Sequence, residues 1–130
     1  MRAEKTDRGL RLVVPSDTLF EPTGKTLRDG ADQTLEKLAA LIAGEQAREV
    51  VVIAHTDGTG DDDDKLALSK ERAGAVAGWL KAHAAKPSAR FIEKFYGRTR
   101  PVAPNKNAEG EDNPEGRAQN RRIEILIRRR

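Results

Sequence analysis

An apolar run, Val50 to Ala54, is followed by a polar, glycine-rich loop and then by a long segment with helical periodicity. Such a run is typical of a strand that is buried on both faces, so the rest of the chain must cover it. In the segment that follows, five apolar residues share one arc at about 100° per residue; they are Leu68, Ala75, Val76, Trp79 and Leu80. The pattern predicts a strand over Glu49–Ala54 and a helix from about Asp64 to Ala85, which Pro87 closes.

Shorter patterns predict the remaining elements. Strands are expected at Leu10–Val14, Phe91–Tyr96 and Ile123–Ile127, a helix from a capping-type residue at Asp29 to Gly44, and a polar loop over Pro101–Pro114. The order strand, helix, strand, helix, strand, loop and strand predicts an α/β fold. We expect an α+β sandwich of βαβαβ-β order, with the helices packed on a mixed four-stranded sheet.

Composition limits the function classes. The chain has 130 residues, of which 37% are hydrophobic, and this fits a single domain over 1–130 with an ordered core at about 9–128. Cysteine is absent, so no disulfide or thiolate-bound metal is expected. The 24 Lys and Arg are nearly balanced by 21 Asp and Glu, and aromatic residues are few, so nucleic acid is not an expected partner. No apolar run reaches the roughly 18 residues of a membrane-spanning helix.

Arg72 is unusual because it falls inside the apolar arc of the second predicted helix. A buried guanidinium keeps its charge and brings five hydrogen-bond donors, so the fold must supply an anion there or bind one. Asp57, in the loop after the buried strand, is the nearest candidate. Such loops are also where α/β folds place ligands. The two residues therefore predict either a structural salt bridge or a binding site.

Four motifs carry a family resemblance. They are His55-Thr56-Asp57-Gly58-Thr59-Gly60, Leu68-Ser69-Lys70-Glu71-Arg72-Ala73, Asn105, and Gly116-Arg117-Ala118-Gln119-Asn120-Arg121-Arg122-Ile123-Glu124-Ile125. In this order they resemble the OmpA-like peptidoglycan-binding domain, which is shared by OmpA C-terminal domains, peptidoglycan-associated lipoproteins and stator proteins of the MotB type. The match runs in register from about Leu10 to Ile127.

The resemblance implies a non-enzymatic module, without cofactor or metal, that binds peptidoglycan in the periplasm and anchors a larger envelope protein to the cell wall. In this family, the residues that match Asp57 and Arg72 hold the ammonium and the carboxylate of a diaminopimelate residue in the stem peptide. Further ligand-binding positions match Thr56, Thr59, Leu68, Phe20, Glu21, Lys65, Asn120 and Arg121.

The resemblance also bears on the protein around this domain. The first 20 residues lack the pattern of a signal peptide, so an exported protein would contain this chain as an excised piece. We expect a tether to the outer membrane, or to the inner membrane, through a missing N-terminal segment or a lipid anchor. A homo-oligomer of the full-length protein is compatible with this reading.

Two departures from the family pattern bear on ligand choice. Lys65 stands where the family commonly has a ligand-binding asparagine, and Ala54 replaces the usual glycine before His-Thr-Asp. The lysine adds a positive charge that would favour a carboxylate, repel an ammonium or pair with the neighbouring aspartates. The alternative hypothesis is therefore a structural or protein-interaction domain with a degenerate ligand pocket.

Three weaker patterns have simpler interpretations. Asp61 to Asp64 lack the ligand spacing of a calcium loop, so we interpret them as an acidic helix N-terminus. His55, Asp57 and Ser69 lie in no nucleophile-elbow motif, and this disfavours a wall hydrolase. The terminal run Arg128–Arg130 is interpreted as a solvated tail.

Overall fold

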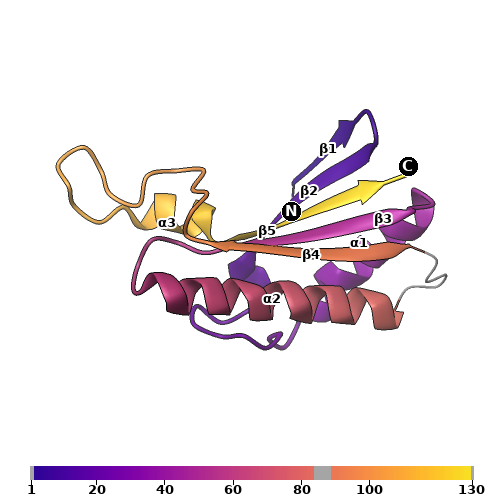
Figure 1. The fold of residues 1–130 in the computed structure, drawn as a ribbon, viewed down its shortest axis with the longest axis horizontal. Coiled ribbons are helices and arrows are strands. Elements are labelled where there is room, and N and C mark those ends of the chain that lie inside the picture. The colour runs from indigo at the N-terminus through magenta and orange to yellow at the C-terminus, as the bar shows by residue number, and fades with distance from the viewer. Residues whose placement is uncertain (1, 84–88, 130) are drawn as a thin grey trace.

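A five-stranded sheet in the order β1-β2-β5-β3-β4 forms the centre of this computed structural model, which describes residues 2–83 and 89–129 (Figure 1). The strands are β1 Arg2–Thr6, β2 Gly9–Pro15, β3 Glu49–His55, β4 Arg90–Gly97 and β5 Arg122–Arg128. Within the described residues, only β3 and β4 pair in parallel, and the other neighbours are antiparallel. The expected α/β fold with a mixed sheet is confirmed, but the sheet has five strands instead of four.

The additional strand, β1, carries no apolar pattern. It pairs with β2 from Arg2↔Val13 to Thr6↔Gly9, and all its side chains are exposed. Because neither face of β1 is buried, nothing selects for alternating apolar and polar residues. Backbone pairing with β2 holds the strand at the sheet edge, and it precedes the ordered core expected at residues 9–128.

Helices α1 Ala31–Gly44 and α2 Asp62–His83 lie on the same side of the sheet (Figure 1). Alternate side chains of the inner strands meet the buried faces of both helices and form one core. Its aliphatic members include Leu12, Val14, Leu35, Leu38, Val50, Val52, Val76, Leu80, Ile123, Ile125 and Ile127. Most of the core thus comes from the predicted strands and from the apolar faces of the predicted helices.

The helix boundaries differ slightly from those expected. α1 begins after Gly30, whose φ of 87° is left-handed, and no side chain caps it, so Asp29 is not the capping residue. α2 begins at Asp62, slightly before the expected start at Asp64. The expected end of this helix, at Ala85 and Pro87, lies outside the described residues.

A short helix, α3 Pro114–Asn120, fills the segment between the polar loop and β5 and was not predicted. Asn113 caps it by accepting a hydrogen bond from the Gly116 amide at 3.3 Å, and proline occupies its first turn. With about two turns of mainly polar sequence, α3 is too short to show an apolar periodicity. A single turn, η1 Ser16–Thr18, follows β2.

Gly97 joins the end of β4 to α2. Its φ is 56°, and a side chain there would press on the backbone of Leu66 in α2. The Gly97 amide donates to Ser69 Oγ at 2.9 Å, and the Ser69 hydroxyl donates to Leu66 O at 2.8 Å. Ser69 is fully buried and fixes α2 against the sheet. It is therefore a packing residue, as its place in the helix indicated.

Within the described residues, the C-terminal arginines do not form a solvated tail. Arg128 ends β5 and binds Glu49 at 2.7 Å, and Arg129 binds Glu45 at 2.7 Å. These contacts attach the end of the last strand to β3 and to the residue that follows α1. The interpretation as a frayed run is wrong for Arg128 and Arg129, and Arg130 lies outside the described residues.

Candidate functional site

Asp57 follows β3 and is only 4% exposed. Its Oδ1 accepts hydrogen bonds from the Thr59 amide at 3.1 Å, the Thr59 hydroxyl at 2.6 Å and Lys65 Nζ at 3.0 Å. Its Oδ2 accepts one from Arg121 Nη1 at 2.8 Å, and Arg117 Nη1 lies 3.8 Å from the same oxygen. The β3–α2 loop, the start of α2 and the α3–β5 junction thus converge on one buried carboxylate.

These contacts keep Asp57 ionised. Burial by itself raises the pKa of this carboxyl, but hydrogen bonds from Thr59, Arg121 and Lys65 outweigh burial and hold the pKa well below its usual range. A carboxylate that stays ionised can order cations and accept hydrogen bonds. It is poorly suited to act as a general acid at neutral pH.

The arginines at Asp57 also bind other carboxylates. Arg121 contacts both carboxylate oxygens of Asp17 at 3.0 to 3.3 Å, and Arg117 makes bonds of 2.6 and 2.7 Å to Asp112. The network has three cations, Lys65, Arg117 and Arg121. They equal its three carboxylates in number, which are Asp17, Asp57 and Asp112. The network is therefore close to neutral and has no excess negative charge of its own.

Arg72 lies on the buried face of α2 and is 1% exposed, as its place in the apolar arc predicted. Its Nε donates to Gly24 O at 2.9 Å, and its Nη2 donates to Glu21 O at 3.0 Å and to Pro22 O at 3.1 Å. The guanidinium also lies 5.0 Å from the centre of the Phe20 ring. Arg72 therefore holds the loop after η1 against α2.

Asp57 and Arg72 form no direct ion pair, so the simple salt bridge considered from the sequence is not present. Burial lowers the pKa of Arg72, and the charge of Asp17 and, to a smaller degree, that of Asp57 oppose this effect. Within residues 2–83 and 89–129, Nη1 of Arg72 is buried without a hydrogen-bond partner. Buried polar groups are usually satisfied, so an unpaired guanidinium donor is a feature expected of an anion subsite.

A pocket of about 520 Å³, here called the α2 pocket, lies where three segments meet. It is lined by Thr23 and Lys25 from the loop after η1, Thr59, Gly60 and Asp61 from the β3–α2 loop, and Asp64, Lys65, Ala67, Leu68 and Glu71 from α2. Thr59 and Lys65 also bind Asp57. Thr23 stands between two of the carbonyls that bind Arg72. Both buried charges thus contact residues of the pocket lining or their chain neighbours, although neither Asp57 nor Arg72 lines the pocket itself.

The sequence-predicted site residues fall into two groups. Thr59, Lys65 and Leu68 line the α2 pocket, whereas Thr56 and Glu21 do not. Thr56 is buried, and its hydroxyl donates to Asp57 O at 3.0 Å, so its side chain orders the loop. The exposed carboxylate of Glu21 pairs with Arg28, and only its backbone carbonyl contacts Arg72.

Asn120, another predicted site residue, clamps the polar loop before α3. Its Oδ1 accepts hydrogen bonds from the Val102 and Ala103 amides at 2.8 and 3.0 Å, and its Nδ2 donates to Ala103 O and Asn105 Oδ1. Asn105 Oδ1 in turn accepts from the Gly58 amide at 3.1 Å, beside Asp57. The role of Asn120 in the structure is to hold the loop.

Three network members, Asp17, Asp112 and Arg117, were not predicted as site residues. Asp17 lies in η1, far from the other members in sequence, and no pattern marks its pairing with Arg121. Arg117 was part of a quoted motif without an assigned role, and only the α3 turn directs it toward Asp57.

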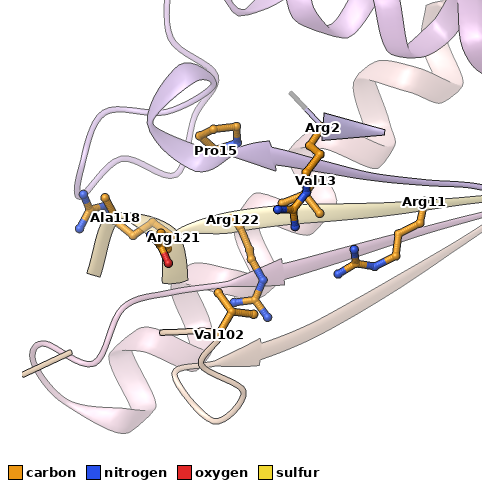
Figure 2. Close-up of a pocket in the computed structure, with 9 residues that line it drawn as sticks. Arg2, Arg11, Val13, Pro15, Val102, Ala118, Arg121 and Arg122 are labelled. Carbon is orange, nitrogen blue, oxygen red and sulfur yellow. The ribbon is translucent and has the colours of Figure 1, made fainter. Parts of the chain in front are cut away.

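A second cavity, of about 460 Å³, lies beside β2 and β5 and is lined by several arginines (Figure 2). Arg11 binds Glu4 and Glu124, and Arg122 binds Glu124. Figure 2 shows the guanidinium of Arg121 pointing away from those of Arg11 and Arg122. The charges of these three arginines are matched by carboxylates, so they do not form an open anion site.

Other chemical roles find little support in the geometry. Asp61 Oδ2 accepts hydrogen bonds from the Asp63 and Asp64 amides, and Asp62 binds Arg98, so this acidic run caps α2. Across residues 2–83 and 89–129, no three His, Asp or Glu side chains are grouped to hold a metal ion. In this same part of the chain, no helix is both long enough and apolar enough to cross a membrane.

His55 and Glu124 form a buried polar pair apart from the α2 pocket. His55 Nε2 lies 3.7 Å from Glu124 Oε1, and the imidazole stacks on Tyr96 with ring centres 5.6 Å apart. His55, followed by Arg122, lowers the pKa of Glu124 to about 2, although burial opposes the shift. The His55 side chain contacts Glu124 and Tyr96, whereas the Ser69 hydroxyl bonds to Leu66 O and the Gly97 amide. The hydrolytic triad considered from the sequence is therefore not formed.

We expect the free energy of unfolding to fall in acid because the folded-state pKa of Glu124 lies below its unfolded value of 4.5. The stabilisation is complete above pH 4.5, and it is lost as the pH falls toward the folded pKa of about 2. Glu124 should account for about 1–2 kcal/mol after allowance for solvent screening. Urea unfolding at pH 7 and at pH 2.5 or so measures the loss, and the Glu124→Gln variant should show a smaller difference. An equal difference in that variant would contradict the assignment.

Comparison with known proteins places the chain in a family. The sequence model of the OmpA family matches residues 19–115, about three quarters of the chain. The chain is 36% identical over 127 residues to the Photosystem I P700 chlorophyll a apoprotein A2 of Gloeobacter violaceus, covering 98% of the chain and 14% of that protein. It is 30% identical over 118 residues to the peptidoglycan-binding protein ArfA of Mycobacterium bovis, covering 91% of the chain and 34% of ArfA. The chain thus spans well under half the length of these two relatives.

Structural comparison agrees with the sequence match. The cell wall anchor of the T6SS from Pseudomonas aeruginosa superposes with a TM-score of 0.83 and is 28% identical in sequence. The superposition covers 98% of this chain and 86% of that protein. The resemblance inferred from the sequence motifs is confirmed: the chain belongs to the OmpA family.

Proposed function

We propose that this domain binds peptidoglycan and anchors a larger envelope protein to the cell wall without catalysing a reaction. The observation that carries the proposal is the unpartnered, buried Nη1 of Arg72, whose guanidinium binds the carbonyls on either side of the pocket-lining residue Thr23. The names of two similar proteins, a peptidoglycan-binding protein and a cell wall anchor, support the same function.

The ligand we propose is a diaminopimelate-type residue of the stem peptide. Its side chain ends in a carboxylate and an amine nitrogen, so it suits one cationic partner and one hydrogen-bond acceptor at a fixed separation. Arg72 would donate from Nη1 to the carboxylate, since a guanidinium suits a planar anion. Asp57 would accept a hydrogen bond from the amine nitrogen, and Leu68 and Thr59 would form the pocket wall.

Affinity for a single residue should be modest. Charge-assisted hydrogen bonds contribute roughly 1.5 to 3 kcal/mol each, so a few of them support micromolar to millimolar dissociation constants. Retention on the wall would come from several tethered copies bound to a repetitive polymer, which raises the effective concentration. The setting that fits this role is the periplasm, with the membrane tether in a part of the protein outside this chain.

The test is co-sedimentation of the purified domain with isolated diaminopimelate-type sacculi. We expect the domain to pellet with the sacculi and to be released by excess soluble stem peptide that contains diaminopimelate. A hydrolase would instead release soluble wall fragments over time, and the supernatant should contain none. Failure to pellet at any domain concentration would contradict the proposal.

A second candidate function is a protein-interaction or structural domain with a degenerate pocket. It is favoured by one observation: Asp57 already binds Lys65 and Arg121, so the network is satisfied without a ligand. In that case the α2 pocket would stay empty, and the domain would remain in the supernatant in the sacculus assay.

A further inference from the structure

We propose that Lys65 determines which chemical form of ligand the α2 pocket accepts, favouring a diamino dicarboxylic residue whose side-chain amine is acylated over one whose amine is free. The inference rests on the proposed function, because it concerns the form of the residue that the same pocket binds. It assigns to Lys65 a role in specificity and no role in catalysis.

Lys65 occupies the place on Asp57 that a ligand ammonium would take. Its Nζ lies 3.0 Å from Oδ1 of Asp57, and the same oxygen accepts two hydrogen bonds from Thr59. Lys65 also lines the α2 pocket, and 18% of its side chain is exposed. Lys65 thus supplies, from within the chain, the cationic partner of Asp57 on the pocket side.

A free ligand amine would carry a second ammonium to this carboxylate. Lys65 and Arg121 already bind it, and the wider network is close to neutral, so the added charge would meet repulsion without a new partner. The remaining acidic groups of the pocket, Asp61, Asp64 and Glu71, are exposed to solvent. Exposed carboxylates attract cations weakly and do not replace a buried one.

An acylated amine avoids this repulsion. The nitrogen of the resulting amide is neutral, so it brings no second positive charge to Asp57, and it keeps one N–H donor. The ligand then carries its carboxylate without a compensating ammonium. Lys65, the less exposed of the two lysines in the pocket lining, favours such an anion. Amines of this kind are acylated wherever two stem peptides are cross-linked through them.

The test is isothermal titration with two synthetic stem peptides that differ by one acetyl group on the side-chain amine of diaminopimelate. We expect the parent domain to bind the acetylated peptide at least about tenfold more tightly than the free-amine peptide. Lys65→Met should remove or reverse this preference, because it removes the ammonium and keeps most of the side-chain length. Lys65→Arg should keep the preference. Thermal unfolding of each variant verifies that it is folded.

The possible results separate the two proposals. If the parent domain binds the free-amine peptide as tightly or more tightly, or if Lys65→Met keeps the preference, the role of Lys65 is refuted while the proposed function stands. If neither peptide binds the parent domain and the domain does not pellet with sacculi, the proposed function fails and the role of Lys65 fails with it.

Discussion

Replacing Asp57 by asparagine is expected to abolish co-sedimentation with sacculi and to lower the free energy of unfolding by about 3 kcal/mol. The amide keeps the shape of the side chain but removes the charge that Lys65 and Arg121 share. The two cations, each with less than a fifth of its side chain exposed, would then face each other across a neutral group. Urea unfolding measures the stability loss, and sedimentation is carried out below the melting temperature of the variant.

Asp112→Asn is the matched control. Asp112 is also a network carboxylate and binds Arg117 at 2.6 and 2.7 Å, but 60% of its side chain is exposed. Because solvent screens an exposed pair, its removal should change stability little and leave wall binding intact. Equal losses of binding in Asp57→Asn and Asp112→Asn would refute a specific role for Asp57.

Arg72→Lys is expected to reduce wall binding by at least about tenfold and to cost about 2–4 kcal/mol of stability. Lysine keeps the charge but cannot reproduce the planar fork that binds the carbonyls of Glu21, Pro22 and Gly24. It also removes Nη1, the donor proposed to hold the ligand carboxylate. The loop after η1, which lines the α2 pocket, should lose protection in amide hydrogen exchange.

Arg28→Lys serves as the control for Arg72. Arg28 comes from the same region, where it pairs with Glu21 at 3.4 Å and donates to Asp17 O, but its side chain is 39% exposed. We expect this variant to differ from the parent by less than about 1 kcal/mol and to bind sacculi normally. Full wall binding by folded Arg72→Lys would show that the ligand carboxylate does not depend on the guanidinium.

Much of the fold was predictable because burial leaves periodic patterns in the sequence. The strand at Glu49–His55 and the arc that places Arg72 inside α2 follow from these patterns alone. β1 was not predictable in this way, since its side chains are all exposed and its pairing depends on the backbone. α3 was too short to show a period.

The candidate site was likewise predictable only in part. That Asp57 and Arg72 belong to one region could be inferred from motif order and from the need of a buried guanidinium for partners. The actual partners of Arg72 are backbone carbonyls, which carry no residue signature. The pairing of Asp57 with Lys65 was one of several options, because the lysine had several aspartates within reach, and only the three-dimensional arrangement selects among them.

The measurement that most directly tests recognition of a diaminopimelate-type residue is titration of the parent domain with two acetylated stem peptides, one containing diaminopimelate and the other lysine at the same position. The two side chains share the acylated amine and differ in the terminal carboxylate proposed to bind Arg72. We predict that the diaminopimelate peptide binds at least about tenfold more tightly, as expected for the loss of one charge-assisted contact. Equal affinity for the two peptides would contradict the central claim.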